Sequence, residues 1–259
     1  VYYGSGAYFQ NCLLGVCEPA SLLGYNVLIT TSNVHDISEL QSLVESNRVD
    51  GMLLTRALED DRALQYLSQV NFPTALTGTC RYDNIIQVDT DNEGAAEKMT
   101  TLLIGKGFRR FAFLVKNMSY NVDRKRHEGF CRALIKNGIS EKDQLFYNGS
   151  IRMEFLDAII ENIISKKVEC IICGDDEICT MVMSRLQAEG YRIPKDVAIA
   201  SLYNSTNLDC YSPAVTAVSV AASQMGGAAV RQLIQRLRGE NYEKKTMLDY
   251  DILFRKSTN

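Results

Sequence analysis

Short apolar runs alternate with stretches of helical periodicity along almost the whole chain. Apolar runs of strand length without polar alternation are typical of parallel strands that are covered on both faces. We predict such strands at Asn26 to Thr31, Gly51 to Leu54, Thr74 to Leu76, Ile85 to Val88, Phe111 to Val115, Glu169 to Cys173, Val197 to Leu202 and, last, Met247 to Phe254.

Helical periodicity fills the segments between these strands. The predicted helices are Ala7 to Leu23, Ile37 to Asn47, Asp60 to Val70, Asn92 to Lys106, Tyr120 to Asn137, Arg152 to Lys166, Asp176 to Glu189 and Ala221 to Arg238. Four glycines stand just past periodic stretches, where a residue that tolerates positive φ ends a helix: Gly24, Gly107, Gly138 and Gly190.

Two aspartates stand at predicted helix starts. Asp91 precedes one helix and Asp175 precedes another, so each side chain can accept hydrogen bonds from free backbone amides. The order of strands and helices predicts an α/β protein with doubly wound parallel sheets. Because the units fall into two series, before and after about residue 107, we expect two similar lobes.

Composition narrows the functional class. The 259 residues are 46% hydrophobic and 23% charged, which excludes a disordered tail, a collagen-like repeat and a disulfide miniprotein. With 28 basic and 31 acidic side chains the formal net charge is -3, so binding of a polyanion by the bulk of the chain is disfavoured. No apolar run approaches the length of a membrane helix, and no secretory signal pattern is present.

The eight cysteines favour a reducing compartment. Several lie within helix or buried-strand patterns, where a free thiol acts as a small apolar side chain. Cys170 and Cys173 have the spacing of a metal knuckle, but residues three apart on a strand face opposite sides and no second pair follows. We therefore predict cytoplasmic free thiols and no metal site there.

Ligands of doubly wound sheets bind outside the carboxyl ends of the strands, so residues that follow strands are the candidate binding residues. Ser5, Tyr8 and Phe9 follow the apolar start of the chain, and Thr55 follows the strand Gly51 to Leu54. Gly4-Ser5-Gly6 lacks the third glycine of a dinucleotide loop and the Lys-Ser/Thr end of a phosphate loop. Adjacent aromatic residues on a helix cannot both face the core, so one of the pair is expected to face a ligand.

In the second series, Asp175-Asp176-Glu177 and Tyr203-Asn204 follow strands. The carboxylates could hold magnesium or share a proton. We prefer one helix cap together with one hydrogen-bond acceptor for a polyhydroxylated ligand. The two histidines, His35 and His127, have no spacing that indicates a metal pair or a triad, which gives nucleophilic hydrolysis little support.

A set of motifs then appears in a definite order. It comprises Asp91-Asn92-Glu93, Gly107-Phe108-Arg109-Arg110, Arg126-His127-Glu128-Gly129-Phe130, Cys173-Gly174-Asp175-Asp176-Glu177, Ile193-Pro194-Lys195-Asp196-Val197, Ser212-Pro213 through Val218, Met225-Gly226 and Arg255-Lys256-Ser257-Thr258. Over nearly its whole length the chain closely resembles the effector-binding core of the lactose-repressor and galactose-repressor family of bacterial transcription regulators.

The resemblance implies a periplasmic-binding-protein type I fold, with two lobes joined by three crossovers and a small effector between them. It places an N-terminal lobe at residues 1–107 with 219–240 and a C-terminal lobe at 108–218 with 241–259. Members of this family normally carry a helix-turn-helix domain ahead of the core. We expect that domain upstream of Val1, so operator DNA would be contacted only through a part absent from this sequence.

The resemblance also assigns roles to particular residues. Arg126 matches the arginine that grips effector hydroxyls or carboxylates, a task that suits the planar fork of a guanidinium. Asp175 and Asp176 match ligand-side positions, Asp91 matches the helix-opening acid, and Tyr8 with Phe9 match the positions of ring-stacking aromatics.

One position departs from the family pattern. Where relatives often have an acid followed by Asn, this chain has Tyr203 before Asn204. A tyrosine offers one hydroxyl and a flat face in place of two charged acceptors, which puts a standard pyranose-binding arrangement in doubt.

The sequence therefore predicts a non-enzymatic, cytoplasmic homodimer that binds a carbohydrate or purine-like effector and needs no cofactor or membrane. The alternative is a periplasmic sugar-binding protein of a transporter, and a third class is an enzyme that uses the aspartates with a metal. Effector identity and the choice between inducer and corepressor stay open.

Overall fold

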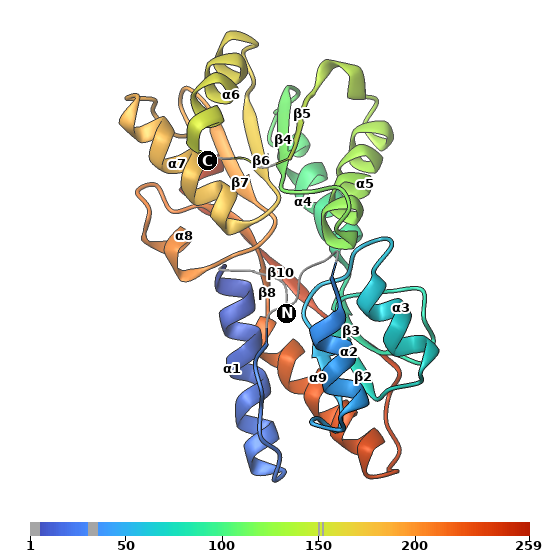
Figure 1. Cartoon of the computed structure of the whole chain (residues 1–259). Helices are drawn as coiled ribbons and strands as arrows, with labels where there is room; N and C mark the ends of the chain where they lie inside the picture. The colour runs from blue at the N-terminus through green and yellow to red at the C-terminus, as the bar shows by residue number, and fades with distance from the viewer. Residues whose placement is uncertain (1–5, 31–35, 150, 152) are drawn as a thin grey trace. The chain divides into compact units, whose positions relative to one another are not determined.

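The computed structural model describes residues 6–30, 36–149, 151 and 153–259. The chain forms two compact units, each built around a sheet with helices on its faces (Figure 1). Unit 1 comprises Val1–Thr90, Ser119–Asn121 and Ala221–Asp249, and unit 2 comprises Asp91–Met118, Val122–Val220 and Tyr250–Asn259. The α/β class with doubly wound, largely parallel sheets is as predicted.

Unit 1 contains a parallel four-stranded sheet in the order β1-β2-β3-β9. Its strands are β1 (Met52–Leu54), β2 (Thr74–Thr77), β3 (Ile86–Thr90) and β9 (Lys245–Leu248), and its helices are α1 (Ala7–Leu22), α2 (Ser38–Glu45), α3 (Arg62–Gln69) and α9 (Ala222–Leu237). One apolar cluster joins α2 and α3 to the sheet, and another joins α1 and α9. The two clusters account for helices on both faces of the sheet.

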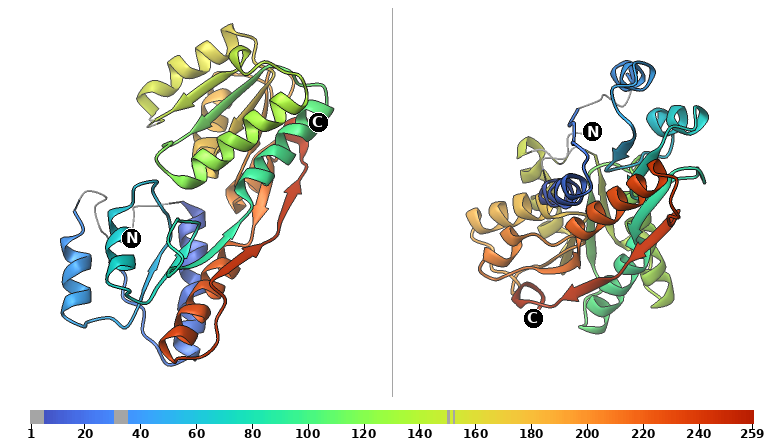
Figure 2. Two further views of the ribbon diagram at one scale, coloured as in Figure 1. Left: turned by 90° about the vertical axis from the view of Figure 1, so that its right-hand side faces the viewer. Right: turned by 90° about the horizontal axis from the view of Figure 1, so that it is seen from below.

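Helices α1 and α9 lie side by side (Figures 1 and 2). Their backbones are in contact at Gly226 of α9, where a Cβ atom would lie 2.1 Å from the carbonyl oxygen of Cys12. Only glycine fits this close approach. The approach fixes the start of α1, which carries Tyr8 and Phe9, relative to α9.

Unit 2 contains a six-stranded sheet in the order β10-β8-β7-β6-β4-β5, in which only the β8–β10 pair is antiparallel. The strands are β4 (Phe111–Val115), β5 (Leu145–Asn148), β6 (Cys170–Cys173), β7 (Ala198–Ser201), β8 (Thr216–Val220) and β10 (Tyr250–Leu253). The helices are α4 (Asn92–Gly105), α5 (Asn121–Lys136), α6 (Met153–Ser165), α7 (Asp176–Ala188) and the short α8 (Thr206–Cys210). Single 3₁₀ turns lie at Glu141–Asp143 and Lys256–Thr258.

The two faces of this sheet have separate apolar cores. Residues of α4 and α5 cover one face, and residues of α6 and α7 cover the other. Cys170 belongs to the first core and Cys173 to the second, which confirms that they point to opposite sides of the strand. Strands β4, β6 and β7 are buried along their whole length, which explains their largely apolar sequences, whereas β8 is buried over its first three residues only.

The eight longer helices and most strands agree with the sequence predictions within about two residues, the usual uncertainty of element ends. The glycines predicted to end helices have positive φ: 82° at Gly24, 104° at Gly107, 67° at Gly138 and 79° at Gly190. Asp91 and Asp175 accept from backbone amides at the starts of α4 and α7, which confirms both predicted caps.

Two predicted strands were wrong, and two strands of the structure were not predicted. Residues 26–30 are not in a strand, although their apolar side chains fit one, and Thr31 lies outside the described residues. The predicted last strand, Met247 to Phe254, is two strands in different units, because the chain leaves β9 at Leu248 and pairs with β8 from Tyr250. Strands β5 and β8 were not predicted; β5 alternates in burial at the sheet edge.

The boundaries between the units differ from the predicted lobes. Helix α4 belongs to unit 2 because Ala96 and Met99 pack with Phe111 and Phe130, whereas the prediction ended the first lobe at residue 107. β9 belongs to unit 1 because it pairs with β3, whereas the prediction placed 241–259 in the second lobe.

Candidate functional site

The carboxyl edge of the unit 2 sheet gathers the polar residues that follow its central strands. Lys116 follows β4, Asp175 comes two residues after β6, and Tyr203 comes two residues after β7. The strands β4, β6 and β7 are neighbours and parallel, so these residues lie at one edge. This is the edge at which doubly wound sheets bind ligands.

Arg126 is the buried cation of this edge. It extends from α5 with only 8% of its surface exposed. Its Nε donates to Oδ1 of Asn92 at 3.2 Å, and its Nη1 donates to the carbonyl oxygen of Gly174 at 2.6 Å. Arg126 is therefore not an ordinary surface arginine, since a guanidinium is buried only where its donors find acceptors.

A close helix contact brings Arg126 to Asn92. At Gly129 on α5, a Cβ atom would lie 2.1 Å from the carbonyl oxygen of Glu93 on α4. The absence of a side chain lets α5 lie directly against the first turn of α4. Arg126, three residues earlier on α5, therefore reaches the start of α4 and the β6–α7 turn together.

Asp175 has two partners within the protein. One oxygen accepts from the backbone amide of Ile178 at 2.9 Å, which caps α7. The other lies 2.8 Å from Nζ of Lys116, and the same ammonium contacts the carboxylate of Glu177. Asp175 is thus a cap and a counter-ion, and these contacts fix its orientation.

The sequence analysis did not name Lys116 as a candidate site residue. Its position directly after the predicted strand Phe111 to Val115 could have identified it. Burial on its own lowers the pKa of Lys116, but Asp175 and Glu177 outweigh this, so the pKa is raised. Lys116 is therefore charged at neutral pH, and it stabilises the two carboxylates against their mutual repulsion.

Asp176 is a buried acid, with 5% of its surface exposed. Burial raises the pKa of this carboxyl; Ser205 opposes the shift and the charge of Asp175 reinforces it. A carboxyl of this kind is a hydrogen-bond acceptor that water reaches poorly, which suits recognition of a hydroxyl or an N–H group.

Tyr203 and Asn204 follow β7 but differ in exposure. Tyr203 is 3% exposed, so its ring is buried in the protein. Asn204 is half-buried, and its Oδ1 accepts from Nη1 of Arg255 at 2.9 Å. Arg255 also donates to the carbonyl oxygen of Val215 at 2.5 Å. It orients the side chain of Asn204, a role that the sequence analysis did not predict.

Unit 1 presents its own candidates at the start of α1 and the end of β1. Tyr8, Phe9 and Thr55 are all half-buried. The hydroxyl of Tyr8 lies 3.9 Å from Sδ of Met225 on α9. Thr55 directly follows β1. Ser5 lies outside the described residues.

Asp91 is exposed and belongs to unit 2. Its Oδ1 accepts from the amide of Gly94 at 2.8 Å, so its observed role is to cap α4. The capped helix begins with Asn92, which is an acceptor for Arg126. Asp91 therefore helps to hold Asn92 in place as an acceptor for Arg126.

The structure thus brings five predicted site residues to one sheet edge in unit 2, namely Arg126, Asp175, Asp176, Tyr203 and Asn204. The predicted residues Tyr8, Phe9 and Thr55 belong to unit 1. Among the described residues, no group of three or more His, Cys, Asp or Glu side chains could hold a metal ion. Within the same part of the chain, no helix has the length and apolar character needed to cross a membrane.

Comparisons with known proteins agree with this architecture. Residues 100–258 match the family described as periplasmic binding protein-like domain. The HTH-type transcriptional regulator CelR of Thermobifida fusca is 26% identical over 96% of this chain and 76% of its own length.

Two solved structures are similar over nearly the whole chain. A putative transcriptional regulator LacI from Bacillus cereus subsp. cytotoxis has a TM-score of 0.89 and 28% identity, covering 96% of this chain and 91% of that one. A CelR–cellobiose complex has a TM-score of 0.86 and 26% identity, covering 96% and 79%. These relatives are transcriptional regulators, and the chain belongs to the periplasmic binding protein-like domain family, with the periplasmic-binding-protein type I fold that its sequence predicts.

Proposed function

We propose that this chain is the effector-sensing part of a transcriptional regulator, and that the residues at the carboxyl edge of the unit 2 sheet bind a small molecule. The observation that carries the proposal is Arg126, a buried guanidinium held by Asn92 and by the carbonyl of Gly174 at the ligand-binding edge of a doubly wound sheet. Such fixed donors and acceptors bind a polar ligand without first paying the cost of ordering.

The side chains at this edge favour a ligand with several hydroxyl or N–H groups. Asp176 is a poorly hydrated acceptor, and Lys116 already offsets the charges of Asp175 and Glu177. This balance suits a neutral, hydrogen-bonding effector such as a carbohydrate or a purine-like base. The regulator CelR, solved with cellobiose, supports the carbohydrate class.

Regulation requires that the effector bind one conformation of the protein better than another. A typical coupling of about 1 to 3 kcal/mol changes affinity for DNA by roughly 5-fold to 150-fold. Because these residues carry a net charge of -3, we assign operator binding to a segment other than the present one. The related regulators favour this function over that of a transport protein.

The test begins with a thermal-shift screen of this chain against mono- and disaccharides, sugar phosphates and purines, followed by calorimetry of the best ligand. Arg126→Ala is expected to weaken that ligand by about 100-fold, the loss of a charge-assisted contact. The matched control is Arg132→Ala, which changes an arginine on the same helix that pairs on the surface with Glu93 and Glu97. Equal affinity in the Arg126→Ala variant would overturn the site.

We also propose a cytoplasmic homodimer. Paired half-sites on DNA call for two-fold protein symmetry. Each cysteine of the chain lies in the described residues and is a free thiol, which agrees with a reducing compartment. Sedimentation equilibrium is expected to show a dimer at micromolar concentration, and a monomer alone would contradict the proposal.

A further inference from the structure

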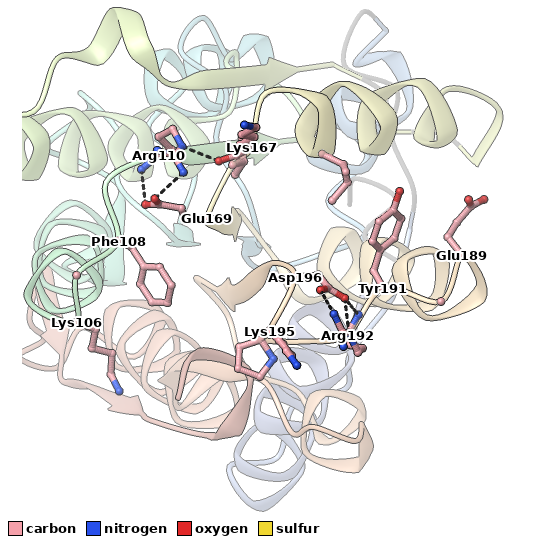
Figure 3. A pocket seen from close by; sticks show the side chains of 15 residues that line it. Lys106, Phe108, Arg110, Lys167, Glu169, Glu189, Tyr191, Arg192, Lys195 and Asp196 are labelled. Atoms are coloured by element: carbon pink, nitrogen blue, oxygen red, sulfur yellow. Dashed lines mark hydrogen bonds and ion pairs between the residues drawn. The ribbon is translucent and has the colours of Figure 1, made fainter.

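A concavity lies at the amino-terminal edge of the unit 2 sheet, opposite the edge that carries the candidate effector residues. It has a volume of about 990 Å³ and is lined by the turns that precede β4, β6 and β7 (Figure 3). All of its lining residues belong to unit 2. Lys116, Gly174 and Tyr203 stand at the other ends of the same three strands, so this concavity is separate from the candidate effector residues.

The lining has an apolar floor and a charged rim. Phe108, Ile164, Tyr191 and Pro194 are half-buried, and Val168 is buried. The rim carries five basic residues, Lys106, Arg110, Lys167, Arg192 and Lys195, and three acidic ones, Glu169, Glu189 and Asp196. In Figure 3, Phe108 and Tyr191 stand on opposite sides of an open centre.

The acidic residues of the rim are already paired. Arg110 lies 2.8 Å from Glu169, and Arg192 lies 2.6 Å from Asp196. The third acid, Glu189, pairs with Arg185, which does not line the concavity. These contacts leave the basic side of the rim in excess.

Three lysines, Lys106, Lys167 and Lys195, supply this excess. In the described part of the chain, the ammonium groups of Lys167 and Lys195 have neither a hydrogen bond nor an ion pair, and Lys195 acts on Asp196 only through its charge. Lys106, by contrast, contacts the side-chain oxygen of Asn259. Lys167 and Lys195 are therefore the cations available to an anion.

A simpler explanation is that basic residues stabilise the helix C-termini that end here. Helices α4, α6 and α7 do end at this edge, and cations are favourable at such ends. Their last turns are nevertheless closed by backbone bonds, Phe108 N to Leu103 O at 3.3 Å, Val168 N to Ile163 O at 3.1 Å and Tyr191 N to Leu186 O at 2.9 Å. Lys166 also stands at the end of α6 but does not line the concavity, so it separates the two explanations.

We propose that this concavity is a second ligand site, which takes a small organic anion with a flat apolar body. The ring of the ligand packs on the floor between Phe108 and Tyr191, and its phosphate or carboxylate group is bound by Lys167 and Lys195. The volume lies at the upper end of the range of roughly 300 to 1,000 Å³ that is typical of small-molecule sites. The site does not depend on the proposed function, because it uses the other edge of the sheet.

The test uses phenyl phosphate as the probe, with titrations of this chain followed by two-dimensional amide NMR. Saturable shifts are expected at the turns that line the concavity, with weaker binding of inorganic phosphate and of phenol. Benzoate in a parallel titration distinguishes a carboxylate ligand from a phosphate ligand. Lys167→Asn with Lys195→Gln is expected to weaken phenyl phosphate at least ~10-fold, the loss of charge-assisted contacts.

Both changes suit their positions, and glutamine at position 195 replaces an exposed lysine. Lys167 has a φ of 53°, a left-handed conformation that asparagine tolerates. The control is Lys166→Gln, which removes the same charge from the same helix end and is expected to change the affinity less than ~2-fold. A Tyr191→Leu variant, which keeps an apolar side chain, is expected to lower affinity for phenyl phosphate but not for inorganic phosphate.

Three results would overturn the proposal. The first is an equal loss of affinity in Lys166→Gln, which would show a general charge effect. The second is equal binding of inorganic and phenyl phosphate, which would show an adventitious anion only. The third is the lack of saturable shifts at the lining turns when the unchanged chain is titrated to millimolar probe.

Discussion

The two edges of the unit 2 sheet treat charge in opposite ways. At the carboxyl edge, Arg126 and Asp176 are buried, and their neighbours are fixed by caps and backbone carbonyls. At the amino edge, Arg192 and Asp196 are exposed, yet hydrogen bonds from Arg192 lower the pKa of Asp196 to about 2. A strong pKa shift can therefore occur in an exposed pair that contributes little to stability.

The difference shows at which edge charged side chains have been removed from water. Burying a charge is unfavourable unless donors and acceptors surround it, so buried charges mark an edge that is organised before a ligand arrives. Exposed charges at the amino edge stay hydrated and can rearrange around a ligand. We expect substitutions at the carboxyl edge to affect stability and affinity together, and those at the amino edge to affect affinity alone.

The largest expected effect is that of Arg126→Ala. The change removes the hydrogen bonds that Arg126 donates to the carbonyl of Gly174 and to the side chain of Asn92. Each unsatisfied buried group costs roughly 1 to 3 kcal/mol, so unfolding free energy is expected to fall by about 3 kcal/mol. Urea denaturation measures the free energy of unfolding. If Arg126→Ala lowered it no more than Arg132→Ala does, the contrast between the two edges would be removed.

A smaller effect is expected for Lys116→Met. Methionine keeps the apolar part of the side chain but leaves Asp175 and Glu177 facing each other without a cation. We expect a loss of about 1 kcal/mol in unfolding free energy at neutral pH. The pKa of Lys116 is raised in the folded protein, so its contribution is present below the ordinary pKa of a lysine and is lost as pH rises through the raised pKa. The loss in the variant should therefore shrink at strongly alkaline pH; a pH-independent loss would assign it to packing instead.

Asp176→Asn is expected to raise stability at neutral pH. Burial raises the pKa of Asp176 above its ordinary 3.8, so the folded state holds the proton more tightly than the unfolded state does. Wild-type stability therefore falls, relative to the variant, as pH rises from the ordinary pKa of an aspartate through the raised pKa of Asp176. At pH values below the ordinary pKa the difference disappears. Melting temperatures between about pH 3 and pH 7 test the sign. A variant that is less stable at pH 7 than wild type would contradict the burial argument.

The smallest effect is expected for Arg192→Gln at the amino edge. The pKa of Asp196 is lowered to about 2, so the pair stabilises the fold above the ordinary pKa of an aspartate and loses this contribution as pH falls through 2. Because both residues are exposed, we expect the melting temperature at pH 7 to change by no more than about 2 °C. A larger change would show that the two edges are not as different as their exposure indicates.

Much of the site was visible in the sequence, because strands and caps are encoded locally. Arg126, Asp175 and Asp176 were identified as candidates, and the caps at Asp91 and Asp175 follow from their positions before helices. Lys116 and Arg255 were not identified, because their partners are remote in sequence. Glu177 is 61 residues away from Lys116, and Asn204 is 51 residues away from Arg255. The buried ring of Tyr203 was equally hidden from the sequence.

The sequence by itself determined the α/β class, the central strands β4, β6 and β7, and the ends of the helices, because each depends on local periodicity and backbone preference. Only the tertiary structure decided that β9 and β10 part into different units and that α4 packs with unit 2. It also decided that Lys116 lies between two carboxylates. The physical reason is that pairing and ion contacts depend on distance in space, which residues remote along the chain share only after folding.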